Sequence, residues 1–291
     1  MPPHTSALTA NANPAAVSLA VSVVVFHPDR SWLEATLSSL AEALSFARAA
    51  GVLDAATVTL VDNAAATPTS EFAGMLPSWF SADADWVQTR VLAGHGNVGY
   101  GAANNLAFAQ TPGANFLLVL NPDVRMDRAA IASSIAQLTL DPGCGMVTPV
   151  ADAPDGTPLF LVKGYPRVWV LAARGFAPAW LKNLLRRRLE QYERADRPHD
   201  SPLADVLLAS GCFQMVRGEV FRRIGGFDPA FFLYFEDFDL SFRLSKVAAI
   251  ARVPECRIVH AGGGAAGKGL THTRMFVRSA LRFFNKHGWR W

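Results

Sequence analysis

Cysteine is scarce in this chain of 291 residues. Its three cysteines, Cys144, Cys212 and Cys256, lie far apart and form no C-x-x-C pair. This pattern argues against a disulfide framework and a zinc knuckle, and it fits a reducing, cytoplasmic environment. An excess of one charge is absent as well, because the formal net charge is only +3. A charge this small does not indicate nucleic-acid binding, so we expect no nucleic-acid partner.

Long hydrophobic runs are also missing. The apolar run at residues 15–26 is shorter than the roughly 20 residues that cross a bilayer, so we interpret it as a buried strand. The N-terminus lacks the basic region of a secretory signal peptide, and residues 1–16 are predicted to form a flexible tail. Hydrophobic residues nevertheless make up 51% of the chain and charged residues 18%, which indicates a folded globular protein.

Strand-like and helix-like segments alternate in the first half of the chain. Apolar, β-branched runs predict strands at residues 21–26, 56–61, 86–92 and 116–120. Helices are predicted after the first, third and fourth of these strands: the first is opened by a capping box at Ser31–Glu34, and the others lie at residues 102–110 and 127–138. This alternation predicts a mostly parallel sheet covered by helices on both faces, with ligands bound beyond the carboxyl ends of the strands.

The second half is less regular. Residues 169–194 are predicted to be helical, with a basic cluster at Arg186–Arg188. Residues 209–216 predict a strand, and Glu236–Leu244 predicts a helix whose acidic first turn suits the helix dipole. Short strands at residues 250–253 and 257–260 precede a glycine-rich loop, and a basic amphipathic helix at residues 271–285 follows that loop.

The glycine-rich segment Gly94–Gly99 matches the G-x-G-x-x-G pattern of dinucleotide-binding loops. A nicotinamide-dependent oxidoreductase is therefore one hypothesis, and a tight loop that only needs glycine is the plainer one. The loop follows the third predicted strand rather than the first, and its helix carries Asn104 and Asn105, which packing alone does not require. The oxidoreductase hypothesis also leaves Asp237 and His260 without a role.

Three side chains at strand ends or helix starts suggest chemistry. Asp123 follows an apolar strand and can hold a hard cation, although an Asn-Pro-Asp turn is common by itself. Asp237 lies among aromatic residues, which raise the pKa of a carboxylate and suit it to general-base work, although acids also favour a helix N-terminus. His260 precedes the glycine-rich loop and can complete a metal site, whereas an isolated histidine is more often structural. Lys268 and Arg274, near this predicted lid, can meet phosphates.

The order of these motifs resembles the family 2 glycosyltransferases of GT-A fold, and most of all bacterial rhamnosyltransferases. The resemblance spans residues 18–265. It rests on Val61-Asp62-Asn63, on Gly96–Gly101 with Asn104-Asn105, on Leu120–Asp123, on Gly225–Asp228, on Phe232–Leu240 and on Val259-His260. It implies a mixed, mostly parallel Rossmann-like sheet with a helical acceptor-side region. It also implies a donor-binding half at residues 17–150, an acceptor-binding and catalytic half at 151–265, and a C-terminal lid and helix at 266–291.

The resemblance also implies roles for single residues. Asp237 matches the catalytic base, and Asp123 and His260 match ligands of Mg²⁺ or Mn²⁺. The donor-binding residues would be Asp62, Asn97, Gly99, Asn104, Asn121 and Lys268, with Asp62 on the nucleotide base, and the acceptor-binding residues would be Tyr234, Glu236 and Asp239. Two departures stand out. Asn121 replaces the first aspartate of the family's Asp-x-Asp metal motif, and Phe26-His27-Pro28 ends the first strand where Tyr-Asn is more usual.

The implied activity is an inverting sugar transfer in cell-surface polysaccharide synthesis. The donor would be a nucleotide sugar, with dTDP-rhamnose as the first interpretation and a UDP-hexose as an alternative, and the acceptor a glycan or lipid-linked glycan. An oxidoreductase and a non-catalytic sugar-nucleotide-binding protein remain alternatives. The basic segment 169–194 and the basic C-terminal helix fit a peripheral contact with the inner face of an anionic membrane, or else ordinary solvated helix faces.

Overall fold

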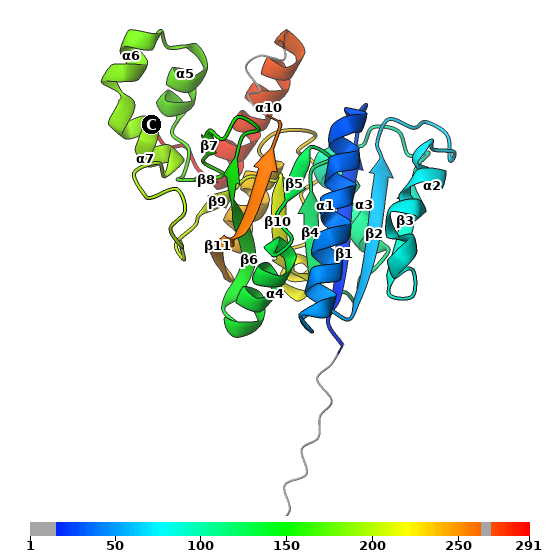
Figure 1. Ribbon diagram of the computed structural model, residues 1–291. Coiled ribbons are helices and arrows are strands. Elements are labelled where there is room, and N and C mark those ends of the chain that lie inside the picture. The colour runs from blue at the N-terminus through cyan, green and yellow to red at the C-terminus, as the bar shows by residue number, and fades with distance from the viewer. Residues whose placement is uncertain (1–15, 263–268) are drawn as a thin grey trace, which may run out of the picture.

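A computed structural model describes residues 16–262 and 269–291, and within them one nine-stranded sheet lies between two layers of helices (Figure 1). Its strands are β1 (Ser18–Val25), β2 (Ala55–Asp62), β3 (Val87–Leu92), β4 (Phe116–Leu120), β5 (Val124–Met126), β6 (Cys144–Asp152), β7 (Pro158–Leu159), β10 (Phe213–Arg217) and β11 (Ala249–His260). They are arranged in the order β3-β2-β1-β4-β10-β6-β11-β5, and β7 pairs with β6. The expected mixed α/β sheet flanked by helices is therefore confirmed.

The strands β3, β2, β1 and β4 are all parallel to their neighbours. Val21, Val23 and Val25 of β1 are buried, as are all five residues of β4, which explains why these strands are nearly continuous apolar runs. The chain winds from β1 towards β3 and then returns to place β4 on the other side of β1. In open α/β sheets, such a reversal marks the place where ligands bind, beyond the carboxyl ends of the two strands at the reversal, here β1 and β4.

The remaining strands are mostly antiparallel to their neighbours. Strand β10 is antiparallel to both β4 and β6, β11 is parallel to β6, and the short strand β5 closes the edge antiparallel to β11. The sheet is continuous from β4 through β10 to β6, and the expected boundary at residue 150 falls inside β6. The two expected halves thus share one sheet.

Helices cover both faces of the sheet. Helices α1 (Arg30–Ala49) and α4 (Ala130–Leu140) pack with the largest apolar core on one face. Helices α3 (Tyr100–Ala109), α8 (Gly218–Arg223) and α9 (Glu236–Leu244) pack on the other. The expected capping box is wrong: the N-cap of α1 lies two residues earlier, because the carboxylate of Asp29 accepts the backbone N–H groups of Ser31 and Trp32.

The segment expected to be one helix at residues 169–194 is three short helices, α5 (Val168–Phe176), α6 (Ala179–Leu184) and α7 (Arg186–Glu193). The chain ends with α10 (Leu270–His287), which packs through Phe283 and Phe284 against an aromatic cluster containing Phe231 and Phe235. The chain also forms α2 (Phe72–Met75), the 3-10 helix η1 (Leu76–Asp83), and a small two-stranded sheet of β8 (Val162–Lys163) and β9 (Leu208–Ala209). In the described ranges, no helix combines the length and apolarity needed to cross a membrane.

Candidate active site

Strands β4 and β11 end at the same edge of the sheet and bring Asp123 and His260 together. The turn Asn121-Pro122-Asp123 follows β4, and His260 is the last residue of β11. His260 pairs across the sheet with Val124, the residue after Asp123. The imidazole Nε2 of His260 therefore lies 3.2 Å from the carboxylate Oδ1 of Asp123. These two residues are 137 positions apart in the chain, and the short edge strand β5 is what joins them.

The atoms that face each other in this pair are buried, yet their contact does not form a hydrogen bond, and no other described residue provides a partner to either. Gly262 encloses them: a Cβ at this position would lie 2.8 Å from Nε2 of His260 and in overlap with Oδ2 of Asp123. Buried polar atoms are nearly always satisfied, so two facing atoms without a hydrogen bond indicate a missing binding partner. Two ligands of one small divalent cation lie about 3 Å apart when the bonds are about 2.1 Å and roughly perpendicular. The pair therefore fits a divalent cation.

The protein alone offers this cation few ligands. Among the described residues, no group of three or more His, Cys, Asp or Glu side chains is arranged to hold a metal ion. Mg²⁺ commonly uses one or two carboxylates and takes its remaining ligands from substrate phosphates and water. A two-residue site of this kind suits a cation that arrives with a diphosphate.

Asp237 lies at the start of α9. The segment 210–212 separates it from the turn that carries Asp123. Its Oδ2 accepts the backbone N–H of Gly211 at 2.9 Å, and its Oδ1 accepts the N–H of Phe238 at 2.8 Å. Burial outweighs these two hydrogen bonds and raises the pKa of Asp237 to about 6. A carboxylate with this pKa is ionised at neutral pH and still accepts a proton readily, as a general base must.

The carboxylates of Asp123 and Asp237 both lie near the buried thiol of Cys212. Burial, and to a smaller extent the charges of Asp123 and Asp237, raise the pKa of the Cys212 thiol to about 12. The backbone also connects them, because the N–H of Asn121 donates to the carbonyl of Cys212, next to the Gly211 that holds Asp237. The edge of the sheet therefore combines a cation site and a base within reach of one bound molecule.

Glu236 lies beside Asp237 and is 6% exposed. Burial and the neighbouring charge of Asp237 raise its pKa well above the usual value, and no described residue forms a hydrogen bond with its Oε2. The environment thus favours a neutral carboxylic acid that can donate a hydrogen bond. The two adjacent acids therefore have unequal environments.

Tyr100 is a site residue that the sequence did not reveal. Its hydroxyl lies 2.7 Å from Oδ1 of Asn121 and 2.8 Å from the carbonyl oxygen of Gly211. Burial raises its pKa well above 10, so the hydroxyl keeps its proton. Tyr100 therefore joins the turn that carries Asp123 to the segment that holds Asp237. The only signal in the sequence was its place directly after the glycine loop.

The glycine loop lies beside this site and is held by side-chain amides. Asn63 donates to Oδ1 of Asn97 at 2.9 Å and accepts the N–H of Val98, while Asn97 accepts the N–H of Gly99. Gly99 has φ 87°, and a Cβ there would overlap the carbonyl oxygen of Phe232. Only glycine fits, because the loop packs directly against the segment that leads to Asp237. His95 of the same loop has a buried Nε2 that forms no hydrogen bond within the described ranges, a second feature that the sequence did not single out.

Two expected donor-binding residues are occupied by internal contacts. Asp62 is buried, and its carboxylate accepts N–H groups of Ala64 and Ala65 and the hydroxyl of Ser70. Asn104 is fully buried between Ser22 and the carbonyl of Tyr100. Asn105, used above as an argument against a dehydrogenase, clamps both backbone groups of Phe227. Both asparagines therefore have packing roles, and their presence does not count against a dehydrogenase.

The expected acceptor residues are also placed unequally. Asp239 is fully buried and is held by Arg243, Lys286 and His287 at 2.7–2.8 Å, so it anchors α10 to α9 and offers no free oxygen to an acceptor. Tyr234 is half-buried, and its hydroxyl lies 2.8 Å from Nδ1 of His272. Lys268 lies outside the described residues, and Arg274 is exposed in the second turn of α10.

With this geometry in place, comparison with solved structures defines the fold class. The chain superimposes on GalNAc-T7 bound to UDP, GalNAc and Mn²⁺ with a TM-score of 0.60 and 14% identity, covering 94% of this chain and 48% of that one. It matches the mannosyltransferase PcManGT of Pyrobaculum calidifontis, bound to GDP-Man and Mn²⁺, with a TM-score of 0.57 and 16% identity, covering 91% and 64%. The fold is therefore the GT-A fold of glycosyltransferases, as the motifs predicted.

The sequence itself is similar to a more particular protein. It is 29% identical over 195 residues to the N-acetylglucosaminyl-diphospho-decaprenol L-rhamnosyltransferase of Mycobacterium tuberculosis, in two strains. This alignment covers 62% of this chain, which spans only 61% of the length of these curated relatives. No protein-family model matches the sequence. The resemblance to rhamnosyltransferases is confirmed as a similarity in sequence, and the solved structures confirm the GT-A fold.

Proposed function

We propose that this protein is an inverting glycosyltransferase that transfers L-rhamnose from dTDP-rhamnose to a lipid-linked glycan during cell-surface polysaccharide synthesis. The observation that carries the proposal is the placement of Asp237, whose pKa is about 6, at the same sheet edge as the unsatisfied pair Asp123 and His260. The similarity to a rhamnosyltransferase supports the choice of sugar, and the word diphospho-decaprenol in that relative's name supports a lipid-linked acceptor.

In the proposed reaction, Asp237 accepts the proton of an acceptor hydroxyl. The hydroxyl oxygen forms a bond to the anomeric carbon of the donor sugar, and the bond from that carbon to the diphosphate oxygen breaks with its electron pair. The nucleoside diphosphate leaves, and the configuration at the anomeric carbon inverts because attack and departure occur on opposite faces of that carbon. The backbone N–H groups of Gly211 and Phe238 fix the direction of the carboxylate.

Asp123 and His260 would hold Mg²⁺ or Mn²⁺ together with the donor diphosphate. When bound, such a cation neutralises the negative charge that develops on the leaving diphosphate. The protein's own contribution is to present two unsatisfied ligands side by side, with Gly262 packed so closely against them that a Cβ would not fit. Tyr100 keeps the turn at Asn121 in register with Gly211, which fixes the cation site relative to the base.

The finer roles are proposed from position. Asn97, Gly99 and Asn121 line the donor side of the site, with Asp62 and Asn104 supporting it from within. Glu236 and Tyr234 face the acceptor side. The lipid-linked acceptor places the enzyme at the inner face of the membrane as a peripheral protein.

A donor panel tests the proposal. Purified protein is incubated with dTDP-rhamnose, UDP-hexoses or GDP-mannose and a lipid-linked N-acetylglucosamine acceptor, and products are identified by mass spectrometry. We expect a mass increase of one deoxyhexose with dTDP-rhamnose and Mg²⁺ or Mn²⁺. Transfer of a different sugar overturns the choice of donor, and no transfer with any donor overturns the activity.

The oxidoreductase alternative is tested by ligand binding. A thermal-shift comparison of NAD with dTDP, UDP and GDP, each with and without Mn²⁺, should give a cation-dependent shift for one nucleoside diphosphate and none for NAD. The dinucleotide hypothesis gains support only if NAD gives the larger shift. A non-catalytic binding protein would show the nucleotide shift and no transfer.

A further inference from the structure

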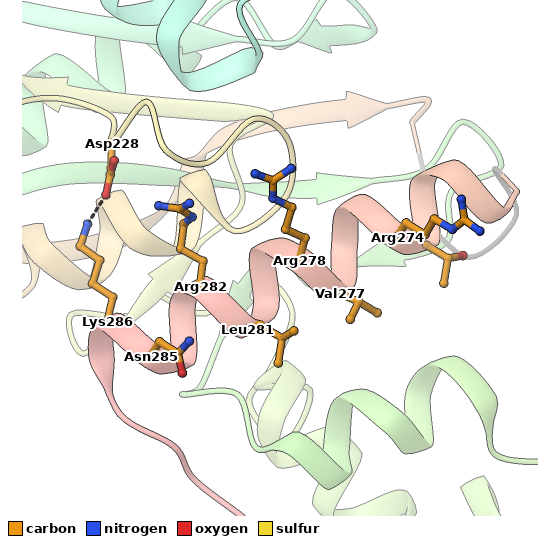
Figure 2. Close-up of a pocket in the computed structure, with 9 residues that line it drawn as sticks. Asp228, Arg274, Val277, Arg278, Leu281, Arg282, Asn285 and Lys286 are labelled. Atoms are coloured by element: carbon orange, nitrogen blue, oxygen red, sulfur yellow. Dashed lines mark hydrogen bonds and ion pairs between the residues drawn. The ribbon is translucent and has the colours of Figure 1, made fainter.

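The outer face of α10 is basic along its whole length. The helix of 18 residues carries Arg274, Arg278, Arg282 and Lys286 and no acidic residue. These four side chains recur every four positions and therefore form one row, as Figure 2 shows. Lys286 pairs with Asp228 and Asp239. In the described part of the chain, the three arginines of the row make no ion pair with a carboxylate, and all three are exposed.

A second row beside the arginines is apolar. Leu270, Val277 and Leu281 are 80%, 45% and 46% exposed, and Val277 and Leu281 project from the same helix away from the arginine row (Figure 2). Beyond the end of the helix, Trp289 and Trp291 are exposed and stacked on each other. The opposite face of α10 is buried in the aromatic cluster around Phe283. The helix is thus fixed to the protein by one face and presents a basic and apolar face to solvent.

We propose that this outer face of α10, made of Leu270, Arg274, Val277, Arg278 and Leu281, docks on the surface of an anionic lipid bilayer. Helices that lie in a membrane interface combine an apolar row, which enters the headgroup region, with a basic face, which binds anionic lipids. Unpaired arginines beside exposed leucine and valine match this chemistry on both counts. A soluble anion would need the arginines alone, whereas the exposed Leu270, Val277 and Leu281 fit the interfacial region of a bilayer.

The docking surface is connected directly to the candidate active site. Ser279 donates to the carbonyl of Leu233, and His272 contacts the Tyr234 hydroxyl, so α10 packs on the segment that leads to Asp237. Docking through α10 therefore places this edge of the sheet near the lipid surface. That placement serves catalysis if the acceptor is lipid-linked, and to this extent the inference rests on the proposed function. The docking itself does not depend on it.

Vesicle co-sedimentation tests the surface. The full chain is mixed with vesicles of phosphatidylcholine alone or of equimolar phosphatidylcholine and phosphatidylglycerol, at low and high salt. We expect binding to the anionic vesicles only, weakened by salt. The double variant Arg274→Gln and Arg278→Gln should bind the anionic vesicles roughly 30-fold more weakly, because two cations near an anionic surface are removed.

A matched control separates this face from charge in general. Arg90→Gln and Arg223→Gln change the net charge equally, at exposed positions on β3 and α8, and should retain wild-type binding. An equal loss in both double variants, undiminished binding by the α10 variant, or no binding by the wild type at low salt each overturns the proposal. Asp237→Asn should sediment like the wild type, so loss of sugar transfer and loss of docking are separate outcomes.

Discussion

The parallel half of the sheet and the candidate active site differ in how their buried polar side chains are hydrogen-bonded. In the parallel half, Asp62, Asn63 and Asn104 are buried, and each is satisfied by neighbouring backbone or side-chain groups. At the candidate site, where β4 and β11 end and α9 begins, Oδ1 of Asp123, Nε2 of His260 and Oε2 of Glu236 form no hydrogen bond with any described residue. Satisfied polar groups rigidify a frame, whereas unsatisfied ones are costly unless a ligand completes them.

This contrast separates supporting residues from reactive ones. Asp237 and Asp239 lie two residues apart on α9 and illustrate it within a single helix. Asp239 is enclosed by three cationic partners, whereas Asp237 has only backbone N–H donors and a raised pKa. We therefore expect substitutions on the unsatisfied side to affect chemistry and substitutions on the satisfied side to affect folding.

The largest effect is expected for Asp237→Asn. The amide cannot accept the proton of the acceptor hydroxyl, so the rate of transfer should fall by about 1,000-fold, within the range of general-base catalysis. Folding and nucleotide binding should persist, as measured by circular dichroism and by thermal shift with the donor nucleotide. Near-normal transfer by this variant would remove Asp237 from the mechanism.

The pH dependence of the wild-type rate provides a check on the same residue. Because the pKa of Asp237 is about 6, transfer should be constant at pH 7–8 and decline as the pH falls through about 6 and the base is protonated. A rate that is flat down to pH 5 would contradict a base with this pKa.

The next largest effect is expected at the cation pair. Asp123→Ala and His260→Ala should each lower transfer by about 100-fold, because part of the charge stabilisation of the leaving diphosphate is lost. Both should also reduce the Mn²⁺-dependent part of the thermal shift produced by the nucleotide. His199→Ala is a suitable control, since His199 forms a comparable contact of 3.0 Å with Asp152 outside this pair. If the nucleotide shift is equally dependent on Mn²⁺ in all three variants, the cation lies elsewhere.

The sequence predicted the parallel half of the sheet better than the half that contains the candidate site. Strands of the parallel half, such as Phe116–Leu120, were located to within a few residues, because strands buried on both faces are continuous apolar runs. Strand β6 was not expected, since Gly145, Thr148 and Pro149 interrupt the apolar pattern and only pairing with β10 and β11 reveals it. The pairing of β11 with β5, which brings His260 to Asp123, is equally non-local.

The types of the site residues were predictable, but their directions were not. Asp239 and Asn104 belong to motifs of the family, yet their side chains turn into the core. Tyr100 was missed because a single tyrosine carries no pattern. Its role depends on Asn121 and Gly211, which tertiary structure alone places beside it.

A smaller effect, on stability, is expected where the glycine loop packs against the segment that leads to Asp237. Gly99→Ala should destabilise the fold by about 2–3 kcal/mol, because φ 87° disfavours a Cβ and that atom would overlap the carbonyl oxygen of Phe232. Chemical denaturation followed by fluorescence gives the free energy of unfolding. Gly113→Ala is the matched control, since a Cβ there meets no atom within 4 Å and its φ is not positive. An equal change in the free energy of unfolding for both variants would mean that the close packing of Gly99 against Phe232 does not stabilise the fold.

The smallest expected effect links the base to stability. The pKa of Asp237 rises from 3.8 to about 6 on folding, so its contribution to stability is fully present below pH 3.8 and is lost as the pH rises through about 6. Removing the charge with Asp237→Asn should therefore stabilise the variant relative to the wild type by about 1–2 kcal/mol more at pH 8 than at pH 4, after allowance for partial exposure. Comparing two pH values cancels any constant cost of the lost N–H acceptor. Asp155→Asn should change in the opposite direction, because hydrogen bonds from Thr157 lower the pKa of Asp155. A difference at Asp237 that is independent of pH would mean that this carboxylate is as well solvated in the fold as in the unfolded chain, and it would then belong with the satisfied side chains of the frame.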